Sequence, residues 1–274
     1  MINWTVITVT FNSQDDLRSH WIEPIPNNVR WIVVDNASTD HTKEIALQLG
    51  AEVIPMSANL GFSAANNKGL AVSLSEYVAF VNPDVTIAWP TLVRLAADID
   101  EFDALVAPAL RNTDGSPQPN GRGLPFLVDK VGHRGLRLPF QRLDQYLPEI
   151  QAGVTAIAWA MGAALCARRT SFNKIGGWND SFFIYYEDHE LGLRAWSNDV
   201  PVLLDPQVKW VHGWARGTAD FNLQAWKHEL ASSWRFYRRY PELLLLTRRH
   251  AQSKLYAVRM ARWKGRISPE RTSC

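Results

Sequence analysis

The chain has 274 residues, of which 46% are hydrophobic and 20% charged, and its formal net charge is +2. This ordinary composition argues against intrinsic disorder, and the length favours one α/β domain with appendages over two separate domains. Cys166 and Cys274, the two cysteines, lie far apart and fit no CxxC or Cys/His pattern, so the sequence predicts neither a disulfide framework nor a structural zinc site. A reducing, cytoplasmic setting fits this cysteine content.

The N-terminal segment from Met1 to Phe11 is typical of a buried strand. It lacks the basic and apolar regions of a signal peptide, so we expect none. No apolar run along the chain reaches the roughly 18 to 20 residues that a membrane-spanning helix needs. We therefore expect a protein that does not cross a membrane by itself.

Two β-branched runs in the first 40 residues predict buried strands. Val6 to Val9 and Trp31 to Val34 each end in a polar segment typical of a turn or a helix cap. After the second run, Asp40 or Thr39 is placed to cap a helix over residues 43–49.

Further strands alternate with helices along the first half of the chain. Val53 to Pro55 and Tyr77 to Val81 predict strands, with a helix over residues 64–74 between them. This alternation implies an α/β fold with a mostly parallel, doubly wound central sheet flanked by helices. Ligands bind such sheets at the carboxyl ends of the strands. The polar residues predicted to converge on that rim are Thr10, Asn12, Asp35, Asn36, Asn82 and Asp84.

The second half of the chain is less regular. Residues 111–153 are rich in Gly and Pro, show little periodicity and contain Arg122, Arg134 and Arg137. A stretch of this kind is usually a functional lid or a poorly ordered segment, and we interpret it as an acceptor loop. Thr155 to Ala167 is typical of an inner strand region, and residues 187–198 predict a helix that begins at an acidic cluster.

The part of the chain from Ala225 onward is strongly basic. It holds twelve Lys or Arg against three Glu, a net charge of +9 that leaves −7 for the rest. Such a tail can face anionic lipid headgroups, a phosphate-bearing acceptor or nucleic acid, or it can be a solvated helix surface. The aromatic residues between these charges are Trp226, Trp234, Phe236, Tyr237, Tyr240, Tyr256 and Trp263.

Several residues at the predicted rim have the chemistry to bind a nucleoside diphosphate. Asp35 can accept a hydrogen bond from a pyrimidine N3–H or a ribose, although an Asx turn or a helix cap also explains it. Asp84 offers an oxygen ligand to a divalent cation that holds phosphates, and His212 can add a neutral imidazole. Taken singly, these two also fit a turn and a structural histidine. Gly61 lies before a helix, where free amides can approach a ligand, or at a plain loop-to-helix junction.

The densest acidic cluster spans residues 185–190. A carboxylate at a helix start, beside other carboxylates, can be held for proton abstraction, although acidic residues there also simply complement the helix dipole. Spacing alone leaves Asp188 and Glu190 both open as the base.

Taken in order, these segments resemble family 2 glycosyltransferases, and most closely their rhamnosyltransferase-like branch. The resemblance runs from Val6 to about Pro241. The matching pieces are Val9-Thr10-Phe11-Asn12-Ser13, Val33 to Asp40, Asn59 to Gly69, Asn82-Pro83-Asp84, Gly162 with Arg168-Arg169, Gly176-Gly177-Trp178, Phe182 to Glu190, and His212. Residues 228–237 also resemble the helix that follows the catalytic region in rhamnosyltransferases acting on lipid-linked glycans.

The resemblance implies the GT-A fold, a Rossmann-like nucleotide-diphospho-sugar transferase fold. Residues 1–222 would form the glycosyltransferase domain, with a nucleotide-sugar half over 1–110 and an acceptor half over 111–222. Residues 223–274 would be a basic, aromatic, helical extension. The residues that the resemblance assigns to the nucleotide sugar are Thr10, Asn12, Asp35, Gly61, Phe62, Asn67, Asn82 and Gly162.

The resemblance also implies an inverting reaction assisted by Mg²⁺ or Mn²⁺. Asp84 would bind the metal with help from His212, and Asp188 would be the general base. Glu187 and Glu190 would touch the acceptor sugar. The implied donor is a dTDP- or UDP-sugar, with dTDP-rhamnose as first choice. The implied acceptor is a glycan, in particular a lipid-linked one used in cell-surface polysaccharide synthesis, at the inner face of the membrane.

Three departures from the family pattern affect these expectations. Asn82 stands where many relatives have Asp, which predicts modest metal affinity. Asn179 and Asp180 follow Gly176-Gly177-Trp178 where many relatives have Gly-Gly-Phe-Asp-Glu, which shifts the acidic residues. The Gln-x-x-Arg-Trp motif of processive synthases is absent, so we expect one sugar per encounter.

Three other function classes compete with this interpretation. A nucleotidyltransferase would carry a Gly-rich, basic loop after the first strand, and residues 10–13 do not match one. A glycan-binding protein without turnover would not need Asp84, Asp188 and His212 together. A nucleic-acid module is motivated only by the basic tail, and we expect no nucleic-acid partner.

Overall fold

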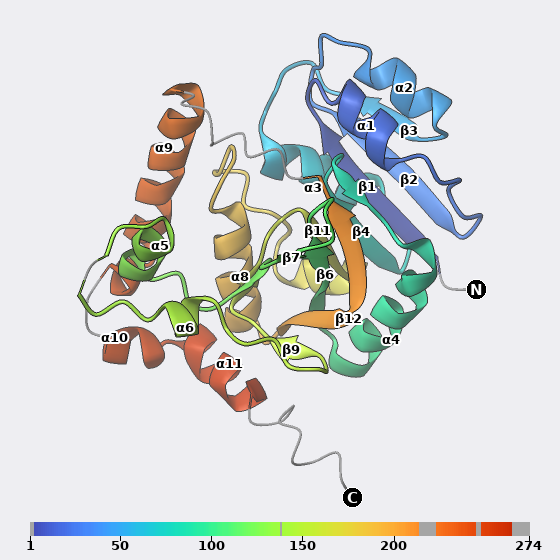
Figure 1. Cartoon of the computed structure of the whole chain (residues 1–274). Helices are drawn as coiled ribbons and strands as arrows, with labels where there is room; N and C mark the ends of the chain where they lie inside the picture. The colour runs from blue at the N-terminus through green and yellow to red at the C-terminus, as the bar shows by residue number, and fades with distance from the viewer. Residues whose placement is uncertain (1–2, 138, 214–222, 245–247, 265–274) are drawn as a thin grey trace, which may run out of the picture.

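The structure, a computed structural model, describes residues 3–137, 139–213, 223–244 and 248–264. Within these residues, ten strands form one mixed sheet at the centre of the molecule (Figure 1). They are β1 (Trp4–Thr10), β2 (Val29–Asp35), β3 (Glu52–Pro55), β4 (Tyr77–Val81), β5 (Val85–Thr86), β6 (Leu105–Arg111), β7 (Pro117–Gln118), β9 (Thr155–Ala156), β11 (Ala164–Arg168) and β12 (Val202–His212). A separate small sheet pairs β8 (Gly121–Arg122) with β10 (Trp159–Ala160).

Helices cover the sheet and extend one side of the molecule. They are α1 (Gln14–His20), α2 (Thr42–Gln48), α3 (Phe62–Val72), α4 (Leu92–Phe102), α5 (Leu127–His133), α6 (Leu143–Tyr146), α7 (Arg169–Lys174), α8 (Glu187–Ser197), α9 (Leu223–Arg239), α10 (Arg248–Gln252) and α11 (Leu255–Lys264). Two short 3₁₀ turns are η1 (Trp89–Thr91) and η2 (Pro241–Leu243). Figure 1 shows α9, α10 and α11 on the side away from α1 and α2, with α8 between them.

The strand order is β3-β2-β1-β4-β11-β6-β12-β5, with β7 beside β6 and β9 beside β12. The first four strands run parallel to one another, and β6 runs parallel to β12. β11 is antiparallel to both β4 and β6, and it joins the parallel block to the second half of the sheet. The predicted α/β fold with a mostly parallel sheet is therefore confirmed.

The strands form where the sequence has continuous apolar runs. Every residue of β4 is buried, as expected for a strand covered on both faces. Helix α3 approaches β1 closely because Gly69 has no side chain, and a Cβ atom there would overlap the Ile7 side chain. This contact brings the start of α3 to the carboxyl end of the sheet.

The prediction for residues 111–153 was partly wrong, because this segment contains β7, β8, α5 and α6. Both helices are too short to be stable by themselves, so sequence periodicity does not reveal them. Distant contacts hold them. The buried carboxylate of Asp129 in α5 pairs with Arg248 of α10 at 2.7 Å, and Tyr146 of α6 is buried.

The tail is helical, as predicted, but most of its aromatic residues are not exposed. Phe236, Tyr237 and Tyr256 are buried, and Trp263 packs edge-on against Phe102 of α4. Among the exceptions, Trp234 is 71% exposed. The tail therefore contributes side chains to the hydrophobic core. The domain boundary predicted at residue 222 stays a prediction.

Several of the tail's basic residues are likewise engaged. Besides Arg248, Arg259 donates to the carbonyls of Trp196 and Ser197 at the end of α8. Arg239 lies 3.4 Å from the Glu190 carboxylate. Arg266, Arg271 and Cys274 lie outside the described residues. None of the described helices is both long enough and apolar enough to cross a bilayer.

Candidate active site

A pocket of about 690 Å³ opens at the carboxyl ends of β1, β2 and β4, which is the rim that the sequence predicts. The predicted residues Gly61, Phe62 and Asn82 line it. The loop before α8 and the first turns of α9 form the opposite wall. The other lining residues are Val9, Phe11, Asn36, Asn59, Pro83, Phe183, Ile184, Tyr185, Ala225 and His228.

Thr10 and Asp35 lie beneath this pocket and do not line it. Both are fully buried, and the Thr10 hydroxyl donates to Asp35 Oδ1 at 3.2 Å. The other carboxylate oxygen, Oδ2, accepts the Ser38 amide at 3.1 Å. This is the turn role that the sequence left open for Asp35, so direct contact with a nucleotide is not supported in this conformation.

Asn12 shapes the neighbouring loop. Its backbone has a left-handed φ of 53°, a conformation that Asn tolerates better than most residues. Its side-chain oxygen accepts the Thr39 amide at 2.8 Å, and its own amide donates to Ser38 Oγ at 2.9 Å. Asn12 is exposed and joins the two polar loops that follow β1 and β2.

Asn36 and Asn59 line the pocket. The sequence placed Asn36 at this rim without assigning it a role in the site, and it did not single out Asn59. Asn36 Nδ2 donates to Asn59 Oδ1 at 2.8 Å, and Asn36 Oδ1 accepts the Leu60 amide at 2.9 Å. Asn59 Oδ1 also accepts the Gly61 amide. The position of Asn36, directly after the strand-end Asp35, was the signal that could have identified it.

The Gly61 and Phe62 amides, at the predicted ligand approach before and at the start of α3, are occupied by the protein itself. The Phe62 amide donates to the Phe183 carbonyl at 2.7 Å. Gly61 has φ of +89°, and a Cβ atom at this position would collide with the Phe183 backbone. Gly61 is therefore required by the close approach of the loop before α8.

Asn67 has a structural role in place of the predicted ligand contact. Its Oδ1 accepts the Trp178 amide and its Nδ2 donates to the Trp178 carbonyl, both at 2.8 Å. Since both ends of the amide are used, Asn67 fixes the Gly176-Gly177-Trp178 turn against α3. Trp178 then packs edge-on against Phe62, at 5.3 Å between ring centroids.

The two predicted metal ligands lie together, although they are 128 positions apart in the chain. His212 Nε2 is 3.3 Å from Asp84 Oδ2, and the Gly213 amide donates to the Asp84 carbonyl at 2.7 Å. Asp84 retains 21% side-chain exposure, whereas His212 is almost fully buried. The described residues contain no group of three or more His, Cys, Asp or Glu arranged to hold a metal.

The hydrogen bonds of His212 fit a metal ligand. Its Nδ1 is 2.7 Å from Gln118 Oε1, and the Gln118 amide is oriented by donation from Nε2 to Asn112 Oδ1. Gln118 Oε1 therefore accepts from Nδ1, and Nε2 is the nitrogen nearer the Asp84 carboxylate. An imidazole nitrogen and a carboxylate this close can both coordinate one cation, and an oriented Nδ1–H is the usual support of a metal-binding histidine.

Asp16 of α1 is a further carboxylate near Asp84. Burial raises the pKa of Asp16, and the negative charge of Asp84 raises it further. The sequence did not single out Asp16, because nothing in its local pattern connects α1 with the end of β4.

Hydrogen bonds connect the acidic cluster on α8 with the end of β4. The Asn82 amide donates to the Ala163 carbonyl at 2.9 Å, and the amide of the adjacent Gly162 donates to Asp188 Oδ2 at 3.3 Å. A Cβ atom on Gly162 would contact the Phe62 ring, so Gly162 also borders the pocket wall. Asp188 is therefore linked to Asn82 through Gly162 and Ala163, whereas Asp84, Asp188 and His212 are not among the residues that line the pocket.

Asp188 is set for an ionised state. Burial acts to raise its pKa, but the neighbouring His189 and Lys130 more than offset burial and lower the pKa below the usual value. The carboxylate keeps 15% exposure. An ionised, reachable carboxylate at this position is chemically able to accept a proton.

Glu187, one residue before, is in the opposite state. Burial and the charge of Asp188 raise its pKa well above the usual value, which favours its protonated form. Its Oε2 atom is buried and has no hydrogen-bond partner among the described residues. A buried carboxylic acid of this kind can donate a hydrogen bond to a ligand.

The prediction that Glu190 touches the acceptor is not supported by its contacts. Glu190 is fully buried, and both of its oxygens accept from Arg194 Nε at 3.0 Å. Arg194 also donates to the carbonyls of Ile175 and Gly177. Through Arg194, Glu190 therefore anchors α8 to the turn at Gly176-Gly177-Trp178. Both of its carboxylate oxygens already accept hydrogen bonds in this network.

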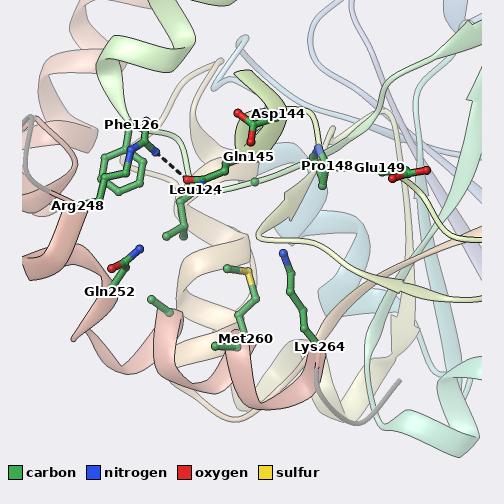
Figure 2. A pocket seen from close by; sticks show the side chains of 13 residues that line it. Leu124, Phe126, Asp144, Gln145, Pro148, Glu149, Arg248, Gln252, Met260 and Lys264 are labelled. Atoms are coloured by element: carbon green, nitrogen blue, oxygen red, sulfur yellow. Dashed lines mark hydrogen bonds between the residues drawn. The ribbon is translucent and has the colours of Figure 1, made fainter. Parts of the chain in front are cut away.

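A second cavity, of about 520 Å³, lies between the segment 123–149 and helices α10 and α11. Figure 2 shows Leu124, Phe126 and Met260 around it, with Arg248 on one side and Lys264 on another. None of the predicted site residues lines this cavity. It is separate from the rim pocket.

Together, the mostly parallel sheet flanked by helices, the pocket at its carboxyl rim and the acidic residues nearby agree with the predicted GT-A fold. Residues 5–167 match the family described as glycosyl transferase family 2, and the chain belongs to this family. The predicted family and fold are thus confirmed.

Two curated relatives indicate the branch of the family. The chain is 28% identical over 183 residues to the N-acetylglucosaminyl-diphospho-decaprenol L-rhamnosyltransferase of Mycobacterium tuberculosis, which covers 60% of this chain and 59% of that protein. The chain thus matches about three fifths of that relative's length. It is 24% identical over 263 residues to the dTDP-rhamnosyl transferase RfbF of Shigella flexneri, covering 94% of this chain and 84% of the relative.

Solved structures support the fold. The chain is similar to the crystal structure of GalNAc-T7 with UDP, GalNAc and Mn²⁺, with a TM-score of 0.62 and 17% identity. The similarity covers 97% of this chain and 54% of that chain. At this identity the likeness concerns the fold alone.

Proposed function

We propose that this chain is an inverting glycosyltransferase that moves a single sugar from a nucleoside diphosphate donor to a hydroxyl of a glycan. The main support is the hydrogen-bonded connection from Asp188 through Gly162 and Ala163 to Asn82. This connection brings an ionised carboxylate next to the strand end that carries Asp84. A base and a phosphate-binding end at one rim are what a single displacement needs.

In the proposed reaction, the acceptor hydroxyl attacks the anomeric carbon from the face opposite the diphosphate. The new C–O bond forms as the bond from the anomeric carbon to the diphosphate oxygen breaks. The hydroxyl proton passes to Oδ2 of Asp188, and the nucleoside diphosphate leaves with the bonding electron pair. Glu187, held protonated by burial, donates a hydrogen bond that positions the acceptor sugar.

Asp84 and His212 would hold a divalent cation, Mg²⁺ or Mn²⁺. When bound there, such an ion would supply the positive charge that offsets the charge developing on the departing diphosphate. The similar GalNAc-T7 structure contains Mn²⁺ with UDP, which agrees with this assignment.

The donor would occupy the rim pocket between Asn36, Gly61, Phe62 and Asn82. Phe11, which is 50% exposed, offers an aromatic face to a base. Thr10, Asn12 and Asp35 would support this wall from beneath. By likeness to the two rhamnosyltransferases, dTDP-rhamnose is the first donor to test and a UDP-sugar the second.

The experiment that tests the proposed function is release of nucleoside diphosphate from a panel of dTDP-, UDP- and GDP-sugars, with and without Mg²⁺ or Mn²⁺. Metal-dependent turnover of one donor is expected. A protein that binds no nucleotide sugar, and instead binds glycans without turnover, would point to the alternative of a glycan-binding protein.

We also propose that the acceptor is lipid-linked and that the outer face of α9 rests on an anionic membrane, at the inner side of the cell membrane. Leu223, Trp226, Leu230 and Trp234 follow one another on this face with exposures of 40% or more. The exposed basic residues beside them are Lys227, Arg235 and Arg238. An apolar stripe bordered by cations is the pattern of a helix that lies in a membrane interface. The start of α9 also lines the donor pocket, so membrane and acceptor would be close to the reaction.

The double variant Leu230→Gln/Trp234→Ser should bind anionic phosphatidylglycerol vesicles at least about tenfold more weakly than the unmodified chain, because two large apolar side chains lose their burial. Vesicle co-sedimentation measures this. The control Leu74→Gln changes a leucine outside α9 that is even more exposed, at 84% against 64% for Leu230, and should bind as the unmodified chain does. If the double variant bound the vesicles as tightly as the unmodified chain, the outer face of α9 would not be the membrane contact.

A further inference from the structure

A buried chain of polar groups leads to Asp188 from helix α5. His189 Nδ1 is 2.6 Å from Asp188 Oδ1, and Lys130 Nζ is 3.2 Å from His189 Nε2. Lys130 belongs to α5, inside the segment predicted as an acceptor loop. The chain Lys130–His189–Asp188 therefore connects that segment with the proposed base.

The imidazole of His189 is held rigidly. It is 5% exposed and stacks on Trp159, with ring centroids 3.6 Å apart and an interplanar angle of 21°. Tyr186 and Phe236 enclose it from the other sides. A ring packed in this way has no room to turn, so its two nitrogens keep their partners.

The hydrogen-bonding capacities of the three groups determine the tautomer of His189. A lysine ammonium has donors and no acceptor, so Nε2 of His189 must accept from Lys130. The ring proton then lies on Nδ1, which donates to Asp188 Oδ1. The His189 backbone amide also donates to Oδ1, at 2.8 Å. With Oδ1 saturated, Oδ2 is the atom left to meet an acceptor hydroxyl.

We propose that Lys130 and His189 are positioning residues for the reaction: Lys130 fixes the tautomer of His189, and His189 orients Asp188. This inference rests on the proposed function of Asp188 as the base. It assigns a role to the segment 111–153 that the donor pocket does not explain. The segment supplies the Lys130 amino group, which donates to His189 and through it fixes the orientation of the base.

The electrostatics around the chain agree with this role. Burial lowers the pKa of His189 to about 4, so the imidazole stays neutral and remains a relay of hydrogen bonds. Burial also lowers the pKa of Lys130 to about 7, against the opposing effects of the nearby carboxylates. Other titratable or charged groups also face the chain Lys130–His189–Asp188. They are Tyr186 just before α8, Glu187 in α8, Arg122 in β8, Arg134 after α5, Tyr146 in α6 and Glu229 in α9.

The sign of the pH effect follows from Asp188. His189 and Lys130 lower its pKa against the effect of burial, so removing either one raises it. The acid limb of kcat/KM, which reports the free enzyme's base, should therefore move to higher pH in Lys130→Met and His189→Leu. A residue that only fills space would lower activity without moving this limb.

The experiment compares Lys130→Met, His189→Leu and His189→Asn, with dTDP-rhamnose or whichever donor the unmodified chain turns over. We expect kcat to fall about 10- to 100-fold in the first two, a size typical of residues that orient a catalytic group, with KM for the donor unchanged. His189→Asn should recover part of kcat, because its amide can still donate to Asp188 Oδ1. The control His133→Leu removes a histidine on the same helix as Lys130 that contacts Tyr146 and not Asp188, and should leave the pH profile unchanged.

Nitrogen-15 NMR of His189 gives a readout that does not depend on turnover. It should show the proton on Nδ1 in the unmodified chain and a tautomer mixture in Lys130→Met. If His189→Leu fails to fold, the pH profile and the His189 tautomer of Lys130→Met test the inference without it. Unchanged pH profiles and an unchanged tautomer in Lys130→Met, alongside an inactive Asp188→Asn, would overturn this inference and leave the proposed function intact. An active Asp188→Asn would instead overturn the proposed function.

Discussion

Asp188→Asn should lower kcat about 10²- to 10⁴-fold, the range that a placed general base contributes, while donor binding persists. The amide matches the carboxylate in size, and its one oxygen can keep the hydrogen bonds from His189. Its NH₂ group then replaces Oδ2, the oxygen that accepts from Gly162 and would take the acceptor proton, so the variant has no base. Release of nucleoside diphosphate measures the loss. Calorimetric titration of the donor checks that the pocket is intact.

Glu187→Gln provides the matched comparison at the adjacent position. Because burial and the charge of Asp188 keep Glu187 protonated, an amide resembles its working state, and activity should stay within about tenfold of the unmodified chain. The same change from carboxyl to amide should therefore cause a large loss of activity at Asp188 and only a small loss at Glu187. A larger loss in Glu187→Gln than in Asp188→Asn would mean that the two carboxyl groups had been assigned in the wrong order.

The parallel part of the fold was predictable because it depends on local patterns. Val6 to Val9, Trp31 to Val34 and Tyr77 to Val81 are short apolar runs ended by polar turns, and each became a strand of the parallel block. Helices α5 and α6 were not predictable in this way. Their stability depends on contacts such as Asp129 with Arg248, which are 119 positions apart in the sequence.

The composition of the site was only partly predictable for a related reason. Asp188 and Glu190 look equivalent by spacing, yet one has an oxygen available for an acceptor and the other is consumed by Arg194. The i,i+4 spacing of Glu190 and Arg194 was a usable sign of that pairing. No comparable sign was available for Asn67, whose partner Trp178 is 111 positions away. Lys130 was hidden for the same reason, because only folding brings α5 to His189.

The metal site offers the second large effect. Asp84→Asn should lower metal-dependent turnover by about 10³-fold or more, since charge neutralisation by a bound ion stabilises the transition state by several kcal/mol. The amide removes the negative charge that attracts the cation and leaves His212 without an ionised partner. Turnover measured across a Mn²⁺ titration tests this expectation. Asp144→Asn, in α6 and beside the separate cavity, is the control carboxylate and should titrate as the unmodified chain does.

His212→Ala separates metal binding from the rest of the site. Asp84 keeps its charge in this variant, so the chain should need about 10- to 100-fold more Mn²⁺ for half-maximal activity but recover most of kcat at saturation. Gln118→Leu should shift the titration in the same direction by a smaller factor, because it removes the acceptor that keeps the Nδ1 proton of His212 in place. A Mn²⁺ titration that is unchanged in both variants would exclude His212 as a ligand and leave Asp84, with Asp16 as its nearest carboxylate neighbour on α1, to bind the cation through oxygen alone.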